Sequence, residues 1–290
     1  MTKFIIFLAI ICVLCLVEWM REIHTFKVTH YYIKSRKLKG LKRERKVVLL
    51  SDLHNYSYGT NNDKLIKAIE KEEPDCILVA GDMLVGKENA STKVAEDFMK
   101  RLPGICDTYH ANGNHEQRMK EFVNLYEDRF FKYQSLLEQA GVHFLSNEKV
   151  SLDWDGVQLD LVGLELPNKK YKKFQRQTLE SEELSALIGN VDELKYNIMI
   201  AHNPAFMDTY LKWGADLVVS GHIHGGVVRL PFVGGIISPQ FKLFPKYSGE
   251  MKKVGNAAAV VSKGIGIHTI KVRLMNPAEV VVMHINSAEE

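Results

Sequence analysis

Short apolar runs recur along the chain, and each is three to five residues long with glycine or a polar residue after it. Runs of this length with such an ending are typical of buried strands. We therefore predict strands at 47–50, 76–80, 108–111, 198–201 and 217–219.

The segments between these runs have a helical pattern. At 62–72 the apolar residues Leu65, Ile66 and Ile69 fall on one face, and 90–102 has a similar stripe. Strands that alternate with helices predict an α/β fold with crossover connections, in which side chains that follow the strands meet at one edge of the sheet. Residues 150–163 predict a hairpin turning at Asp155-Gly156. We expect a two-layer β-sandwich flanked by helices.

The amino terminus has a different pattern, because residues 4–17 include no polar side chain other than cysteine. At about 1.5 Å per residue this run covers roughly 21 Å of a hydrocarbon core near 30 Å. Trp19 and Met20 lengthen it, and Lys3 and Arg21 can snorkel from its ends. A cleavable signal peptide is the alternative, but no small-residue cleavage site follows. We predict an uncleaved single-pass membrane anchor at 1–20.

Positive charge is concentrated after this anchor. Residues 21–46 hold ten Lys or Arg and two acidic residues, although the whole chain has a formal net charge of only +3. We predict a basic juxtamembrane segment at 21–46 that attracts anionic lipid headgroups, each charge contributing on the order of 1 kcal/mol; a solvated linker is the alternative. A domain at 47–290 follows. Its acidic balance argues against nucleic acid as a partner.

The charge asymmetry also predicts orientation, because Lys and Arg near a span favour the cytoplasmic side. We expect the carboxyl-terminal domain there, with the exported side as the alternative. The four cysteines, Cys12, Cys15, Cys76 and Cys106, indicate no disulfide framework.

Metal-ligand residue types follow all five predicted strands. Carboxylate, imidazole and amide oxygen suit Mn, Fe or Zn, and an aspartate can bridge two cations. One such fragment alone is a weak signal, but the ordered series supplies enough ligands for two ions. Two cations would give a hydroxide near neutral pH for in-line attack on a phosphoryl group. The series is Asp52, His54, Asp82, Asn114, His202, His222 and His224.

Several motifs resemble those of the calcineurin-like metallophosphoesterases over most of 47–285, and most closely their membrane-anchored bacterial branch. They are SDLHN at 51–55, GHIHGG at 221–226, RLP at 229–231, FPKY at 244–247 and SKGIG at 262–266. The resemblance implies two divalent cations, with Mn expected first and Fe or Zn as alternatives. It implies that Asp52, His54 and His224 hold the first metal, that Asn114, His202 and His222 hold the second, and that Asp82 bridges them.

The resemblance also implies that His115 is not a ligand, so it can protonate the leaving oxygen or bind the phosphoryl group. We expect it to be the catalytic acid. Relatives often place an acid three residues beyond the bridging aspartate to orient this histidine, whereas Val85 stands here. A histidine without a carboxylate partner is a weaker acid. A phosphoanhydride, whose phosphate leaves readily as an anion, therefore suits this chain better than an alkyl ester.

Two further segments bear on the substrate. Residues 168–177 are basic and aromatic and predict an exposed loop, and residues 230–244 are apolar but broken by Gly and Pro. If exposed, the second segment would suit acyl chains or a membrane surface; the alternative is a core connection. With the anchor, it favours a lipid-linked or sugar-nucleotide diphosphate such as UDP-2,3-diacylglucosamine. The alternatives are a general phosphodiesterase for soluble nucleotides or glycerophosphodiesters, and a non-catalytic interaction module.

Overall fold

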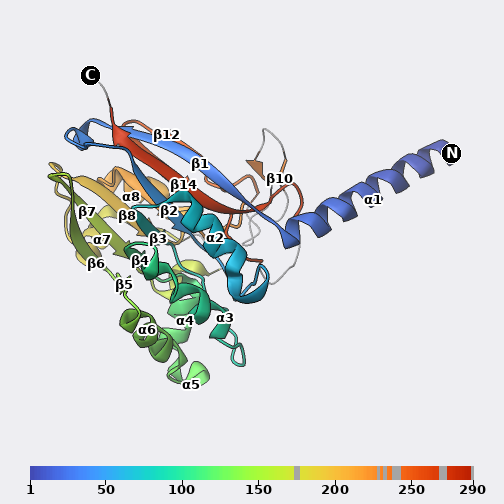
Figure 1. Ribbon diagram of the computed structural model, residues 1–290, viewed down its shortest axis with the longest axis horizontal. Helices are drawn as coiled ribbons and strands as arrows, with labels where there is room; N and C mark the ends of the chain where they lie inside the picture. The colour runs from blue at the N-terminus through green and yellow to red at the C-terminus, as the bar shows by residue number, and fades with distance from the viewer. Residues whose placement is uncertain (173–176, 227–228, 231–233, 237–242, 268–272, 289–290) are drawn as a thin grey trace.

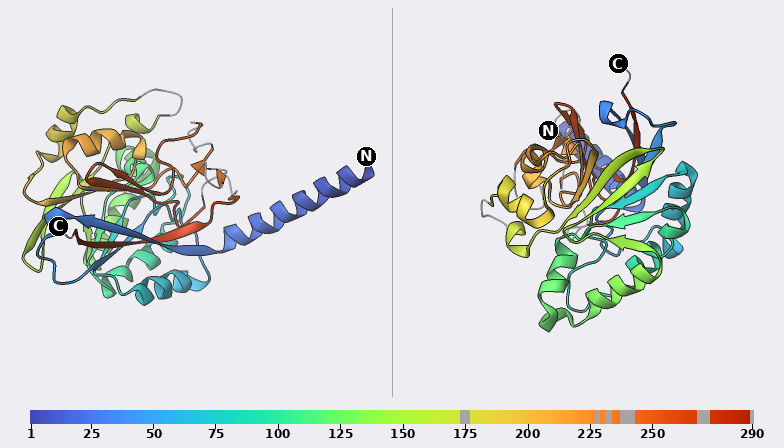
Figure 2. Two further views of the ribbon diagram at one scale, coloured as in Figure 1. Left: turned by 90° about the horizontal axis from the view of Figure 1, so that it is seen from above. Right: turned by 90° about the vertical axis from the view of Figure 1, so that its left-hand side faces the viewer.

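The computed structural model describes residues 1–172, 177–226, 229–230, 234–236, 243–267 and 273–288. Two six-stranded sheets stack face to face, and helices cover the outer face of each (Figures 1 and 2). The predicted α/β sandwich flanked by helices is confirmed.

The first sheet has the strand order β1-β14-β2-β3-β4-β5. Strands β2 to β5 run parallel, while β14 is antiparallel to β2 and parallel to β1. In chain order they are β1 (Phe26–Ser35), β2 (Arg45–Leu50), β3 (Cys76–Val79), β4 (Thr108–His110), β5 (Val142–Phe144) and β14 (Ala278–Ser287).

The second sheet has the order β12-β13-β9-β8-β7-β6, with four parallel strands inside and an antiparallel strand at each edge. The predicted hairpin is its β6–β7 pair, with Trp154 opposite Val157. The strands are β6 (Glu148–Trp154), β7 (Val157–Leu164), β8 (Tyr196–Ala201), β9 (Leu217–Ser220), β12 (Met251–Val254) and β13 (Ala257–Val261). A separate ribbon pairs β10 (Arg229–Leu230) with β11 (Gly234–Gly235).

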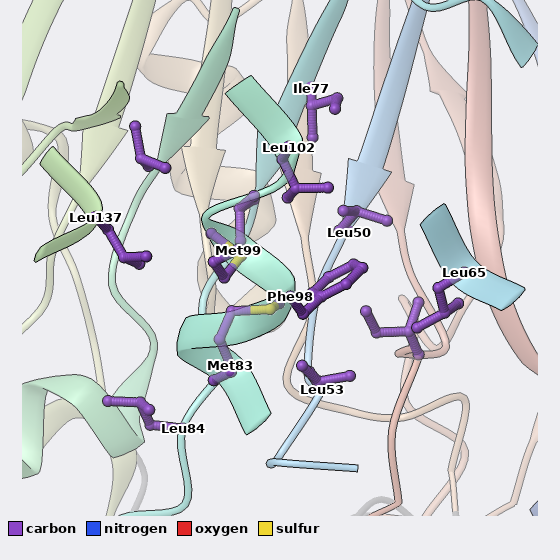
Figure 3. Packing of buried hydrophobic residues seen from close by; sticks show 14 of the residues in the cluster. Leu50, Leu53, Leu65, Ile77, Met83, Leu84, Phe98, Met99, Leu102 and Leu137 are labelled. Atoms are coloured by element: carbon purple, nitrogen blue, oxygen red, sulfur yellow. The ribbon is translucent and has the colours of Figure 1, made fainter. Parts of the chain in front are cut away.

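Helices α2 to α6 pack on the first sheet, and α7 and α8 pack on the second. Figure 3 shows Phe98 of α3 beside Leu50 and Leu53 in the first outer core, which also contains Met99. The helices are α2 (Asp63–Glu72), α3 (Lys93–Met99), α4 (Asn114–Glu121), α5 (Val123–Tyr126), α6 (Arg129–Gln139), α7 (Ser181–Ile188) and α8 (Met207–Trp213), and the 3-10 turns are η1 (Arg36–Leu38), η2 (Thr60–Asn62), η3 (Leu102–Gly104), η4 (Asn168–Tyr171) and η5 (Pro204–Phe206).

The helix predicted at 90–102 is shorter than expected. Helix α3 ends at Met99, and the 3-10 turn η3 follows with Pro103 inside it. Proline has no N–H to donate and disfavours helical geometry in the residue before it, so the apolar stripe outlasts the helix.

Helix α1 (Thr2–His24) projects away from the domain (Figures 1 and 2). Among the described residues it is the one helix long and apolar enough to cross a membrane, and none of its apolar window is buried. Such a helix could act as an anchor or as a signal sequence.

The basic segment 21–46 differs from our expectation. Its residues Phe26–Ser35 form β1, which pairs along its whole length with β14, so the folded domain begins well before residue 47. Charged residues such as Lys34 obscured this strand, in which Val28 packs against the outer core and Ile33 against the core on the opposite face of the sheet.

The same strand carries most of the basic residues away from α1. Ten extended residues span about 33 Å, so those after Ile33 lie at the far end of the sheet, where ion pairs hold several of them. Lys37 pairs with Asp216 at 2.9 Å, and Arg45 pairs with Asp155 at 2.8 Å. Folding therefore places these charges away from the end of the helix, and the attraction of segment 21–46 to lipid headgroups stays a prediction.

Candidate dinuclear metal centre

All eight side chains singled out from the sequence follow carboxyl ends of strands at one edge of the sandwich. Asp52 and His54 follow β2, and Asp82 follows β3. The other sheet contributes residues after β8 and β9, so both layers build the site. The remaining five are Asn114 and His115 at the start of α4, His202 after β8, and His222 and His224 after β9.

The backbone at this edge is in the left-handed region, which side chains other than glycine rarely adopt. Each such residue costs on the order of 1 kcal/mol, and conformations of this kind gather at functional sites. Sharp turns of this kind redirect the side chains after each strand. The residues and their φ angles are Asp52 (56°), His54 (48°), Asp82 (55°), His222 (71°) and His224 (53°).

Two glycines allow the carboxylates to pack against backbone. A Cβ on Gly113 would overlap Oδ1 of Asp82, and a Cβ on Gly221 would overlap Oδ2 of Asp52. Only glycine therefore fits at either position while the carboxylate keeps its place.

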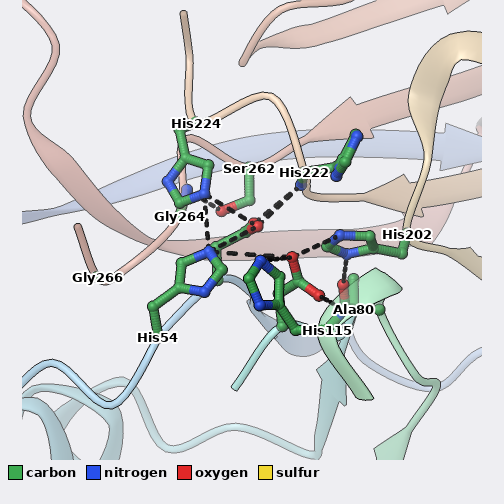
Figure 4. Close-up of polar contacts among 12 residues, drawn as sticks. His54, Ala80, His115, His202, His222, His224, Ser262, Gly264 and Gly266 are labelled. Atoms are coloured by element: carbon green, nitrogen blue, oxygen red, sulfur yellow. Dashed lines mark hydrogen bonds and ion pairs between the residues drawn. The ribbon is translucent and has the colours of Figure 1, made fainter. Parts of the chain in front are cut away.

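The first ligand group contains Asp52, His54 and His224, whose donor atoms lie within 4.8 Å of one another. The Nε2 atoms of His54 and His224 are 3.0 Å apart, and Nε2 of His224 is 3.3 Å from Oδ1 of Asp52 (Figure 4). Nδ1 of His54 is 3.3 Å from the oxygen of Leu84 and must donate to it, because a carbonyl only accepts. In the neutral ring Nε2 then has a lone pair suited to a cation.

The second group contains Asp82, His202 and His222. Nδ1 of His202 donates to the oxygen of Ala80 at 2.6 Å, so in the neutral ring the lone pair of Nε2 would face Oδ2 of Asp82, 3.1 Å away. The Nε2 lone pair and the carboxylate oxygen repel each other unless a positive charge lies between them. Burial alone would lower the pKa of His202, but the Asp82 carboxylate overcomes this and raises the pKa to about 9. A divalent cation can supply the same positive charge.

Asn114 also offers an atom that could bind a cation. Its side-chain oxygen is buried and has no hydrogen-bond partner among the residues that the structure describes. Buried polar atoms are nearly always satisfied. Together with the two histidine groups, this orphaned oxygen shows that the donor set fits divalent cations.

Asp82 belongs to the second group and also approaches a histidine of the first. Its Oδ2 is 3.1 Å from Nε2 of His202 and 3.9 Å from Nε2 of both His54 and His115. The backbone N–H of His115 fixes the other oxygen, Oδ1, at 2.8 Å. One carboxylate is thus held within reach of histidines from both sheets.

His115 obtains its orientation from the backbone. The N–H of Gly86 donates to its Nδ1 at 2.7 Å, so in the neutral ring the proton is on Nε2. That nitrogen points towards Asp82 and the metal ligands (Figure 4). Burial lowers the pKa of His115 below its ordinary value. The side chain of Val85 offers the ring no acceptor. The backbone N–H of Gly86 holds the ring instead.

Glu116 is a site residue to which the sequence reasoning gave no role. Its buried carboxylate accepts hydrogen bonds from the backbone of Asp82 at 2.8 Å, Leu84 at 2.9 Å and Gly113 at 3.1 Å. Burial and the nearby Asp82 raise the pKa of Glu116 to about 7. A glutamate three residues after a helix-capping position was the available signal.

Asn276 is a second residue that we did not foresee. Its side-chain amide donates to the oxygens of His224 at 2.6 Å and Gly226 at 2.8 Å, which fixes the turn bearing the last ligand. Its position outside every motif left no signal. Tyr171 belongs to the predicted basic loop at 168–177, of which residues 173–176 lie outside the described residues. The centroid of its ring is 5.3 Å from that of the His222 ring.

Comparisons with known proteins agree with this geometry. The calcineurin-like phosphoesterase family model matches residues 45–226. An uncharacterized metallophosphoesterase of Aquifex aeolicus is 30% identical over 267 residues, covering 91% of this chain and 93% of that protein. The uncharacterized metallophosphoesterase YkuE of Bacillus subtilis is 24% identical, covering 92% and 87%. Phosphodiesterase YaeI of Escherichia coli is 24% identical, covering 76% and 75%. The chain therefore belongs to the calcineurin-like phosphoesterase family and is a metal-dependent phosphoesterase.

Proposed function

We propose that the two histidine groups hold two divalent cations joined by Asp82. Asp52, His54 and His224 would hold the first, and Asn114, His202 and His222 the second. Support comes from these two donor groups, which a third group of His54, Asp82 and His115 connects, and from the orphaned oxygen of Asn114. Bound there, two cations would activate a water and polarise the phosphoryl group. Manganese is our first choice, with iron or zinc as alternatives, since these donors accept several metals.

His115 is the proposed catalytic residue outside the ligand set. Because Gly86 donates to Nδ1, the proton on Nε2 is directed into the site. His115 would donate this hydrogen bond to a phosphoryl or leaving oxygen. To transfer the Nε2 proton fully, the His115 ring would also need a proton on Nδ1. Nδ1 faces the N–H of Gly86, which disfavours a proton there. This arrangement stabilises a phosphoryl group more readily than it protonates a poor leaving group.

The preferred substrate is therefore a phosphoanhydride, whose leaving phosphate departs as an anion. The observation that carries this choice is the backbone partner of His115 in place of a carboxylate. The apolar helix α1 adds a reason to favour a lipid-linked or sugar-nucleotide diphosphate such as UDP-2,3-diacylglucosamine. The second candidate is a general phosphodiesterase, which the name of the Escherichia coli relative favours.

We place the protein at the cell membrane with α1 as a single span. The domain would lie on the cytoplasmic side, since the rule that relates Lys and Arg to orientation counts residues along the chain near the span, whatever their place in the fold. A reporter fused after residue 288 and tested for activity on each side of the membrane checks this placement.

The substrate is tested with the full chain in detergent and Mn²⁺, by comparing UDP-2,3-diacylglucosamine with bis-p-nitrophenyl phosphate. We expect a higher kcat/KM for the diphosphate and loss of both activities in Asp82→Ala. His115→Ala should lower both activities, and His143→Ala, at an exposed histidine, is its matched control. Preference for the diester would instead support the general phosphodiesterase.

A further inference from the structure

Strand pairing determines which edge of the domain lies next to α1. A single residue, Thr25, separates α1 from β1, and Phe26 at the start of β1 pairs with Ala278 at the start of β14. Because β2 is antiparallel to β14, its carboxyl end returns to that same edge. The ligands follow the carboxyl ends of β2 and of the strands parallel to it. Helix α1 therefore leaves the domain at the ligand-bearing edge. Figure 1 shows it projecting from the end of the sheet where β1 begins.

Hydrogen bonds tie the end of α1 to the ligand loops. The hydroxyl of Tyr56, two residues after His54, donates to the oxygen of Ile23. The backbone N–H of Asn276 donates to the buried carboxylate of Glu22 at 3.0 Å. Asn276 in turn holds the oxygen of His224. The helix end is thus fixed against both loops of the first ligand group.

Four large apolar side chains are exposed at this edge: Leu230, Leu243, Phe244 and Met275, with exposed fractions of 43%, 64%, 62% and 54%. Their segments are linked, since Arg229 donates from its backbone to Leu274 at 3.4 Å and Phe244 to Ile236 at 2.8 Å. The ribbon β10–β11 lies on the α1 side of the domain in Figure 1 and in the left view of Figure 2.

In the predicted apolar segment 230–244, Leu230, Leu243 and Phe244 are exposed, whereas Gly235 is buried and its two neighbours are half-buried. Residues 231–233 and 237–242 lie outside the described residues. Exposed apolar groups of this size usually mark a binding surface. The partner that fits here is a lipid surface, because an apolar helix with no protein cover leaves from the same edge, and its Trp19 lies near the domain as interfacial aromatic residues do.

We propose that the ligand-bearing edge lies against the bilayer, with Leu230, Leu243, Phe244 and Met275 in the headgroup region. The proposal rests on α1 being a membrane anchor. It places the metal ligands on the side of the domain nearest the lipid, so a phosphate at headgroup level reaches them while its acyl chains stay in the membrane. The far edge, with Lys37 and Arg45, then faces water.

Depth-dependent quenching tests the contact with the full chain in phosphatidylcholine vesicles. All proteins carry Trp19→Phe to remove the tryptophan of α1, and Phe244→Trp or Leu194→Trp adds a new one. Leu194 is exposed and lies two residues before the amino end of β8, at the opposite edge, which makes it the matched control. Lipids brominated near the headgroup should remove about half of the emission added by Phe244→Trp and little of that added by Leu194→Trp, because interfacial side chains enter this depth.

Equal quenching of the two added tryptophans would overturn the proposal, whether both are quenched or neither is. A second copy of the chain could cover the surface instead. In that case Phe244→Trp would be protected from aqueous iodide in detergent, more so at higher protein concentration, and brominated vesicles would not quench it. This result would also overturn the proposal. Flotation of the same proteins with vesicles reports the anchor separately. A chain that does not float refutes the anchor, whereas a chain that floats without quenching of Phe244→Trp refutes only the contact surface.

Discussion

The backbone N–H of Gly86 donates a hydrogen bond to Nδ1 of His115 at 2.7 Å. A histidine held by an N–H donor keeps its proton on the opposite nitrogen, whereas one held by a carboxylate is supported as an imidazolium. In this chain the backbone fixes the ring, and Nε2–H is aimed at the ligands.

Removing this histidine should affect good and poor leaving groups alike. We expect His115→Ala to lower kcat by about 100-fold, near the low end for a positioned proton donor. The loss should be similar for p-nitrophenyl and alkyl phosphodiesters, since a hydrogen bond to the phosphoryl group does not depend on the leaving group. Steady-state kinetics on the two substrates measures this. A much larger loss on the alkyl ester would identify His115 as the acid.

A carboxylate at position 85 should change that preference. Val85→Asp would offer His115 an acceptor and support its protonated form. The ratio of alkyl to p-nitrophenyl diester turnover should therefore rise about tenfold, less than the gain that a fully positioned acid gives. Val85→Asn is the uncharged control of the same size. An unchanged ratio in Val85→Asp, equal to that of Val85→Asn, would show that the ring cannot leave Gly86.

Asn276 should stabilise the first metal through its two hydrogen bonds to carbonyl oxygens. We expect Asn276→Ala to weaken metal binding by about 10-fold to 100-fold, as losses of groups that orient ligands do. Titration of the metal-free protein with Mn²⁺ by calorimetry gives the affinity. Unchanged affinity with a lowered Tm would assign Asn276 to folding alone.

Glu116 should support the fold and the site together. Glu116→Gln keeps the shape but turns an amide N–H₂ towards the N–H groups of Asp82, Leu84 and Gly113, so at least one of them loses its acceptor. We expect the free energy of unfolding to fall by about 1–3 kcal/mol, the cost of an unsatisfied buried donor. Urea denaturation measures the change. Glu121→Gln, in the same helix, is the control for burial, because that exposed carboxylate also accepts hydrogen bonds, from Gln117 and Asn168. No difference between the two would contradict this role.

The fold followed from local patterns, whereas part of the site did not. Short apolar runs such as 76–80 specify a strand on their own, and the order of strands and helices then brings the residues after them to one edge. The partners of the site contact one another through backbone groups: Gly86 donates its backbone N–H to His115, and the side chain of Asn276 donates to the backbone oxygen of His224. A backbone N–H is present at almost every position, so the sequence carries no sign of which one is used.

Strand β1 was missed for a different reason. Its cationic residues suggested a solvated segment, and the closing strand β14 that pairs with it is some 250 residues away in the chain. Local charge was visible in the sequence, but the acids that neutralise it, such as Asp216 and Asp155, become neighbours only in the folded chain.

The most direct test of the dinuclear centre is a titration of the metal-free full chain with Mn²⁺ while hydrolysis of bis-p-nitrophenyl phosphate is followed. Two cations joined by Asp82 predict activity that reaches its plateau at about two equivalents per chain, as two-metal hydrolysis requires, and Asp82→Ala should remain inactive at every equivalent. Full activity at one equivalent, or in Asp82→Ala, would contradict the two-metal account.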